Sequence, residues 1–164
     1  MEQTLSPLLT LIDATWDMAS RYIAKHHDRE WMPQFVAETA TGERTVFLTP
    51  WRDEADKVAT LLMLGLTFRA KGIKRYVLSS EAWMAKDVGE PSANFVMPSK
   101  RPDRMEVLQC IGVDPEAGEI MQYHAPIIRV GKRRKVGERN VAPYACFSGR
   151  MTELLGPVAL RPVN

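Results

Sequence analysis

Short connections between strand-like segments constrain the fold of this chain more than any other feature. Residues 34–40 and 44–48 are joined by Thr41-Gly42-Glu43, and residues 104–113 and 119–130 are joined by the turn 114–118. Connections of this length join antiparallel neighbours, because parallel strands need a crossover of a dozen or more residues. With residues 75–84, which also alternate, the pattern predicts a mostly antiparallel sheet of about five strands whose order is left open.

Two segments show helical spacing instead. Ser6 and Pro7 are typical of an N-cap and a first helical residue, and apolar residues recur at helical spacing from residue 8 to residue 26. A second helix is expected to open at residues 49–50 and to close at Gly72. Because it is apolar on more than one face, we expect it to be the most buried element. The predicted order is α-β-β-α-β-β-β in an α+β fold, with weaker signals for a strand over residues 141–147 and a helical turn over 150–155.

Length and composition favour one domain over residues 1–164. The formal charge of +2 is too balanced to indicate nucleic-acid binding by itself. The longest apolar run, residues 61–66, is far too short to cross a membrane, and the first residues have no basic segment of the secretory type. Cys110 and Cys146 show no CxxC spacing, which favours reduced thiols in a cytoplasmic protein. We expect no membrane association and no cofactor.

Catalytic signatures such as GxGxxG, HExxH and GxSxG are absent from the sequence. Ionisable residues nevertheless fall inside predicted strands: Glu38, Glu81, Glu106 and His124. Two carboxylates beside a histidine can perform acid–base chemistry, so Glu81, Glu106 and His124 are the candidate catalytic residues. The structural alternative is an ion pair of Arg104 with one of the two glutamates. The sequence therefore leaves open whether the protein is an enzyme, and favours a protein that is not.

A metal site is not predicted. His26, His27 and Asp28 are adjacent at the end of the first helix, where neighbouring side chains point about 100° apart and rarely share one ion.

Basic residues gather in two places. Residues 131–139 are expected to form a basic loop, and within 129–139 the cations are Arg129, Lys132, Arg133, Arg134, Lys135 and Arg139. Lys100, Arg101 and Arg104 form a second group around the long Pro-rich segment 86–103, which is expected to be a loop. Such clusters can bind phosphates or an acidic protein surface. The alternative is a solvated hairpin tip whose charges protect a sheet edge.

Three tryptophans outside the first helix, Trp31, Trp51 and Trp83, are expected to pack in the core. An exposed tryptophan would instead indicate a protein interface, because aromatic residues are enriched at binding hot spots.

Two stretches carry a resemblance. Residues 69–84 end a strand in Ser80-Glu81-Ala82-Trp83, and residues 98–108 open another with Asp103-Arg104-Met105-Glu106. Together they resemble a family of small, uncharacterised proteins encoded by bacteriophages and bacteria. The resemblance covers about the middle third of the chain and implies a phage or mobile-element context, in which small binding proteins are common.

The leading hypothesis is a phage- or bacteria-encoded accessory protein that binds a macromolecule without catalysis. The partner that we favour is a host or phage protein. The candidate binding residues are Trp83, Arg101, Arg104, Arg133, Arg134 and Lys135. One alternative is a nucleic-acid-binding protein that uses residues 129–139. The other is a hydrolase that uses the strand carboxylates.

Overall fold

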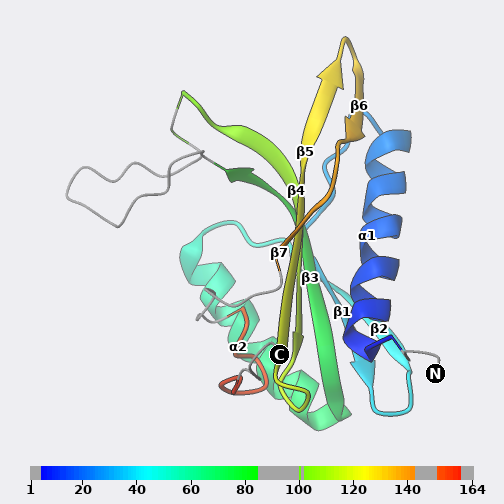
Figure 1. Cartoon of the computed structure of the whole chain (residues 1–164). Coiled ribbons are helices and arrows are strands. Elements are labelled where there is room, and N and C mark those ends of the chain that lie inside the picture. The colour runs from blue at the N-terminus through cyan, green and yellow to red at the C-terminus, as the bar shows by residue number, and fades with distance from the viewer. Residues whose placement is uncertain (1–4, 85–99, 101, 143–150, 160–164) are drawn as a thin grey trace.

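The computed structural model describes residues 5–84, 100, 102–142 and 151–159. Within these ranges the chain forms two helices and seven strands (Figure 1). The elements are α1 (Pro7–Lys25), β1 (Gln34–Thr39), β2 (Arg44–Leu48), α2 (Glu54–Lys71), β3 (Ile73–Met84), β4 (Met105–Asp114), β5 (Glu119–Val130), β6 (Arg133–Val136) and β7 (Asn140–Ala142). The predicted α+β class with an antiparallel sheet is confirmed, and β6 and β7 extend the five predicted strands.

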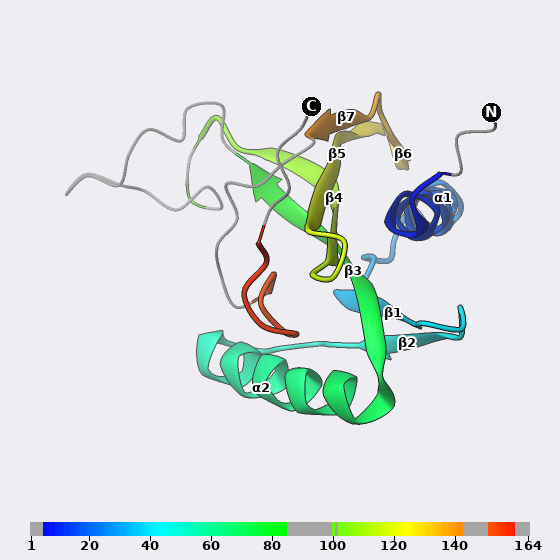
Figure 2. The ribbon, with the colours of Figure 1, turned by 60° about the horizontal axis from the view of Figure 1, so that its bottom comes forward.

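The sheet order is β2-β1-β3-β4-β5-β6, and β7 also pairs with β5. All these pairs are antiparallel. The two helices lie on opposite faces of the sheet (Figure 2). Side chains alternate between the two faces along a strand. In β3, Val77 therefore packs in the core under α1, whereas the adjacent Tyr76 and Leu78 pack in the core under α2. The fold therefore has two apolar cores that share one sheet.

The first helix begins as the sequence predicts. Ser6 is the N-cap, its Oγ accepts a hydrogen bond from the Leu9 N–H at 3.1 Å, and Pro7 is the first helical residue. The Ser6 hydroxyl also donates to Glu119 Oε2 at 3.0 Å, which fixes the start of α1 on β5. The predicted apolar stripe, which includes Ile12 and Ile23, is buried against the sheet.

The second helix departs from the prediction in two ways. It begins at Glu54 behind the N-cap Asp53, because Thr49 is still bonded to the Pro33 carbonyl by both its N–H and its hydroxyl. It does end at Gly72, whose φ of 66° lies in the left-handed region that favours glycine. The prediction that α2 is the most buried element is wrong, because it buries only one of its two apolar faces.

The region after residue 126 also differs from the prediction. Pro126 pairs with Val107 of β4, and its carbonyl accepts a hydrogen bond from Gly137 N–H at 2.8 Å where the outer partner of β5 changes from β7 to β6. The predicted basic loop is wrong for Arg133–Val136, which form β6. Residues 151–155 form turns instead of the predicted helical turn. Residues 143–147 of the predicted strand, and most of the predicted loop 86–103, lie outside the described residues.

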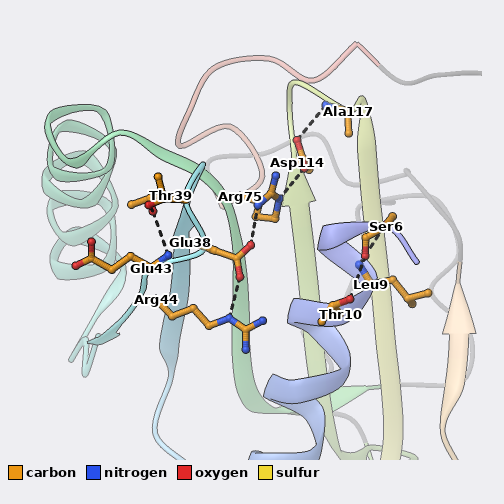
Figure 3. Close-up of polar contacts among 11 residues, drawn as sticks. Ser6, Leu9, Thr10, Glu38, Thr39, Glu43, Arg44, Arg75, Asp114 and Ala117 are labelled. Atoms are coloured by element: carbon orange, nitrogen blue, oxygen red, sulfur yellow. Dashed lines mark hydrogen bonds and ion pairs between the residues drawn. The ribbon is translucent and has the colours of Figure 1, made fainter. Parts of the chain in front are cut away.

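A chain of ion pairs crosses four strands on the α1 face, near the base of the sheet (Figure 3). Arg44 of β2 donates to Glu38 of β1 at 2.8 Å, and Arg75 of β3 donates to Glu38 at 2.7 Å and to Asp114 of β4 at 2.9 Å. Asp114 also accepts from the Ala117 N–H at 2.9 Å and so closes the predicted 114–118 turn. Glu38 is one of the four ionisable residues that the sequence places inside strands. Both of its carboxylate oxygens accept hydrogen bonds from arginines, and these ion pairs hold neighbouring strands in register.

Candidate functional site: a charged cleft at the ends of β3 and β4

A cleft of about 480 Å³ opens where β3 ends and β4 begins. Its walls are the segment 27–30 after α1 and side chains from β3, β4, β5 and β6: Glu81, Trp83, Glu106, Arg129 and Arg134. The register of β3 and β4 explains the gathering, because Trp83 pairs with Glu106 and the face they share also carries Glu81. Alternation along residues 75–84 predicts that Glu81 and Trp83 share one face, and the structure confirms this; Glu106 joins them through the pairing of β3 with β4, which the sequence left open.

Each carboxylate of the cleft is held by a guanidinium group. Glu81 Oε1 accepts a hydrogen bond from Arg134 Nη1 at 2.8 Å, and Glu106 accepts two from Arg129, at 2.9 and 3.0 Å. Arg134 Nη1 also lies 4.0 Å from Glu106 Oε1, so both carboxylates lie close to one charged nitrogen. The sequence suggests Arg104 as an ion-pair partner of Glu81 or Glu106. In the structure the Arg104 guanidinium group lies over the Trp83 ring, 4.7 Å from the ring centre.

Arg134 is the most deeply buried cation of the cleft, with a side chain 3% exposed. Besides Glu81, its guanidinium group donates to the backbone carbonyls of His26 and Arg29, and its backbone N–H donates to His27 Nδ1 at 3.1 Å. These contacts fasten the chain that follows α1 to the β5–β6 hairpin. Arg134 is therefore part of the framework, and the expectation that it contributes a solvated charge to a basic loop is wrong.

Glu81 joins the same framework from the other side. Its Oε1 accepts from the Trp31 N–H at 2.8 Å, while the Trp31 ring N–H donates to Ser79 Oγ at 2.7 Å. Burial raises the pKa of Glu81, an effect that the hydrogen bonds from Trp31 and Arg134 oppose and that the negative charge of Glu106 reinforces. Trp31 is buried, as expected, whereas Trp83 is 45% exposed at the cleft wall.

The third candidate catalytic residue lies elsewhere. His124 pairs with Gln109 of β4, and the face they share is opposite to the face of Glu81 and Glu106. The His124 Nδ1 atom is buried and has no hydrogen-bond partner among the described residues. The structure thus brings the two glutamates together but does not bring the histidine to them.

The basic cluster is divided between two faces of the β5–β6 hairpin. Arg129 pairs with Arg134, and both point into the cleft. Arg133 and Lys135 pair with Val130 and Ile128, and all four side chains belong to the other face. Arg101 lies outside the described residues. The cations of residues 129–139 therefore do not form one continuous basic surface.

Metal binding has no support in the part of the chain that the structure describes, where no group of three His, Cys, Asp or Glu side chains could hold an ion. His27 accepts a hydrogen bond from Arg134, and His26 stacks on Tyr22 with ring centres 4.5 Å apart. Neither described helix is long and apolar enough to span a membrane.

Sequence reasoning missed the part that the segment 26–31 plays in the cleft. Three of its contacts use backbone atoms, the carbonyls of His26 and Arg29 and the N–H of Trp31, which side-chain types do not reveal. Comparison of the chain with protein-family models, with curated proteins and with solved structures finds no match in any of the three.

Proposed function

We propose that this chain is a phage- or bacteria-encoded accessory protein that binds a segment of another protein in the cleft, without catalysis. The observation that carries the proposal is Trp83, a large aromatic side chain that stands 45% exposed beside the ion pairs Glu106–Arg129 and Glu81–Arg134. Tryptophan and arginine are the residue types most enriched among binding hot spots. The resemblance of residues 69–84 and 98–108 to phage and bacterial proteins supports the context.

The hydrogen bonds that Glu81 and Glu106 already accept favour a binding function over acid–base catalysis. A general base needs an oxygen that can approach a substrate proton at hydrogen-bonding distance. Glu106 has both oxygens engaged by the fork of Arg129, and Glu81 is directed at Trp31 and Arg134. A substrate would have to displace Arg129 before Glu106 could take a proton. Both hydrogen bonds to Glu81 end on its Oε1, and burial, with the side chain only 7% exposed, keeps the rest of that carboxylate from a substrate.

The cleft has the rigidity that a preformed binding site requires. Trp83 and Glu106 stand on paired strands, and the segment 27–30 is fixed by the buried contacts of Arg134. A cavity of about 480 Å³ falls within the usual range for binding pockets and admits a few side chains of a partner. Preorganised walls reduce the entropy lost when the partner binds.

The test is a pull-down from a bacterial host extract with and without nuclease, followed by an affinity measurement with the recovered partner. Trp83→Ala should weaken binding by at least about 30-fold, because truncation of a hot-spot residue costs about 2 kcal/mol or more. Arg129→Ala should also weaken it. The double variant Arg133→Ala/Lys135→Ala, which changes the opposite face of the hairpin, is the matched control and should bind like the wild type.

Three results would overturn the proposal. The first is a partner whose binding is unchanged in folded Trp83→Ala. The second is a nuclease-sensitive partner lost in the Arg133/Lys135 control, which would transfer the function to nucleic acid. The third is turnover of a small molecule that Glu106→Gln abolishes, which would establish an enzyme.

A further inference from the structure

Strand β2 is the outermost strand of the sheet, and among the described strands it pairs with β1 alone. An open edge offers unpaired backbone groups to other chains, and proteins usually protect it with a lysine, a proline or a bulge. Within its described residues, Arg44–Leu48, β2 contains neither lysine nor proline, and its pairing with β1 has no register shift. This edge of the sheet therefore lacks the usual protection against a further strand.

The hydrogen bonds between β1 and β2 show which backbone groups point to the open edge. Thr49 bonds toward β1, because its N–H donates to the Pro33 carbonyl at 2.9 Å. The bonding direction alternates along an antiparallel strand, so every second residue directs its N–H and C=O away from β1. The residues with this outward direction are Leu48, Val46 and Arg44.

A strand added to this edge would meet apolar side chains on both faces of the sheet. On the α1 face, Val46 and Leu48 are 50% and 63% exposed. On the α2 face, a groove of about 570 Å³ lies between β2 and α2, and uncharged side chains such as Phe47, Thr60 and Met63 line it. An open edge with pockets for alternate side chains is the arrangement by which sheets bind extended peptides.

We propose that the edge of β2 binds an extended segment of another protein, which adds a strand to the sheet antiparallel to β2. Main-chain hydrogen bonds to Arg44, Val46 and Leu48 hold the segment. Its side chains alternately pack on Val46 and Leu48 and enter the groove beside α2. The antiparallel direction follows from the slightly greater stability of antiparallel pairing per residue. The site is separate from the cleft, which β2 does not line.

Arg44 gives the segment a charge preference. Its Nε donates to Glu38 at 2.8 Å, whereas its two Nη atoms point away from Glu38 (Figure 3). The Arg44 side chain is 40% exposed, so a carboxylate on the added strand can accept hydrogen bonds from these Nη atoms. The expected segment therefore alternates apolar, uncharged, apolar, uncharged and acidic residues, with the apolar ones opposite Leu48 and Val46.

A second copy of this chain does not supply such a segment. When two β2 strands pair through their open edges, the residue opposite Arg44 is itself outward-bonding, and is Arg44, Val46 or Leu48 of the other copy. None of these is acidic. The Phe47 ring, which faces the groove side, packs on Phe68 of its own copy with ring centres 5.4 Å apart, so it would not fill the groove of the other. The charge of Arg44 thus selects a different protein as the occupant.

Selection of displayed random peptides on the purified full chain tests the proposal. The recovered peptides should share the alternating pattern with its terminal acid. In an NMR titration, a synthetic peptide of that sequence should shift the backbone amide signals of Arg44, Val46 and Leu48. Replacing its acid with lysine should weaken binding about threefold or more, by the usual strength of cross-strand charge pairs. Failure to recover this pattern, or amide shifts confined to other residues, would refute the proposal.

Variants of the chain separate the backbone contribution from that of the side chains. Val46→Pro removes an outward N–H and keeps the bonds to β1, so it should weaken binding at least about tenfold while its circular dichroism stays native. Leu48→Gln should weaken binding as well. Leu62→Gln, at a residue of similar exposure on α2 outside the groove, is the matched control and should bind like the wild type, as should Trp83→Ala. A peptide that folded Val46→Pro or Leu48→Gln binds as tightly as the wild type would refute strand addition at β2.

Discussion

Replacing Arg134 with methionine removes the guanidinium group from the wall of the cleft and keeps an apolar stem of similar length. The side chains of Arg134 and Glu81 are 3% and 7% exposed, so the carboxylate of Glu81 would stay buried without its counter-ion. Breaking a buried ion pair from one side destabilises a protein by about 3–5 kcal/mol. The lost bonds to the carbonyls of His26 and Arg29 act in the same direction.

The loss should depend on pH, because Glu81 can take up a proton. Burial already holds the pKa of Glu81 above its ordinary value of 4.5, and without Arg134 it should rise further. A carboxyl whose pKa is raised in the folded state contributes most to stability below its unfolded pKa, and this contribution is lost as the pH rises through the folded pKa. The deficit of Arg134→Met should therefore be largest at neutral pH and should shrink as the pH falls toward 4.5.

Urea unfolding of wild type and Arg134→Met, at neutral pH and near pH 4.5, measures both effects. Arg133→Met is the matched control: its exposed side chain lies on the other face of the same strand, and it should stay within about 0.5 kcal/mol of the wild type. If Arg134→Met is as stable as this control at neutral pH, the guanidinium group does not hold the cleft together. A deficit that grows on acidification would refute the assignment of the loss to Glu81.

Two further predictions concern the base of the sheet. Glu38→Gln keeps the shape of a side chain that is 7% exposed but removes the charge between two arginines, so we expect a loss of about 1.5–3 kcal/mol in urea unfolding. Glu43→Gln, an exposed change in the same hairpin, should change stability by less than about 0.5 kcal/mol, and an equal effect of the two would contradict the role of the ion pairs. Ser6→Ala removes the N-cap of α1 and should lower the free energy of unfolding by about 1 kcal/mol, whereas Ser6→Asp, which keeps a capping oxygen, should recover part of it despite the nearby Glu119.

The sequence is most informative where structure is decided locally. The N-cap at Ser6, the left-handed Gly72 and the hairpin turns depend on a few adjacent residues, and all are present. The alternation along β3 also placed Glu81 and Trp83 on one face correctly. Once the short turns require antiparallel pairing, these local features suffice to predict the fold class.

Burial was harder to predict because it depends on distant contacts. A run of cations around Arg134 indicates a segment that is exposed to solvent. In the structure, however, Gly131-Lys132 is a two-residue hairpin turn between two strands, with a φ of 62° at Gly131. Reading that turn as a hairpin would have placed alternate cations on opposite faces and Arg134 on the same face as Arg129. The partner of Arg134 is Glu81, 53 residues away, and no local pattern reveals it.

The apolar residues of α2 show a second limit of sequence patterns. Leucines on two sides of a helix indicate that both sides are apolar. They do not indicate whether each side is packed against another part of the same chain. Here the sheet covers the side with Leu61 and Phe68, and the side with Leu62, Met63 and Leu66 stays exposed.

The α2 helix and the cleft lie at opposite ends and on opposite faces of β3. Tyr76, near its start, packs with α2, whereas Trp83, near its end, forms the cleft wall. Leu66→Gln, a change on the exposed side of α2, should therefore leave binding at the cleft intact, and a folded Leu66→Gln variant that loses binding would contradict the assignment of binding to the cleft.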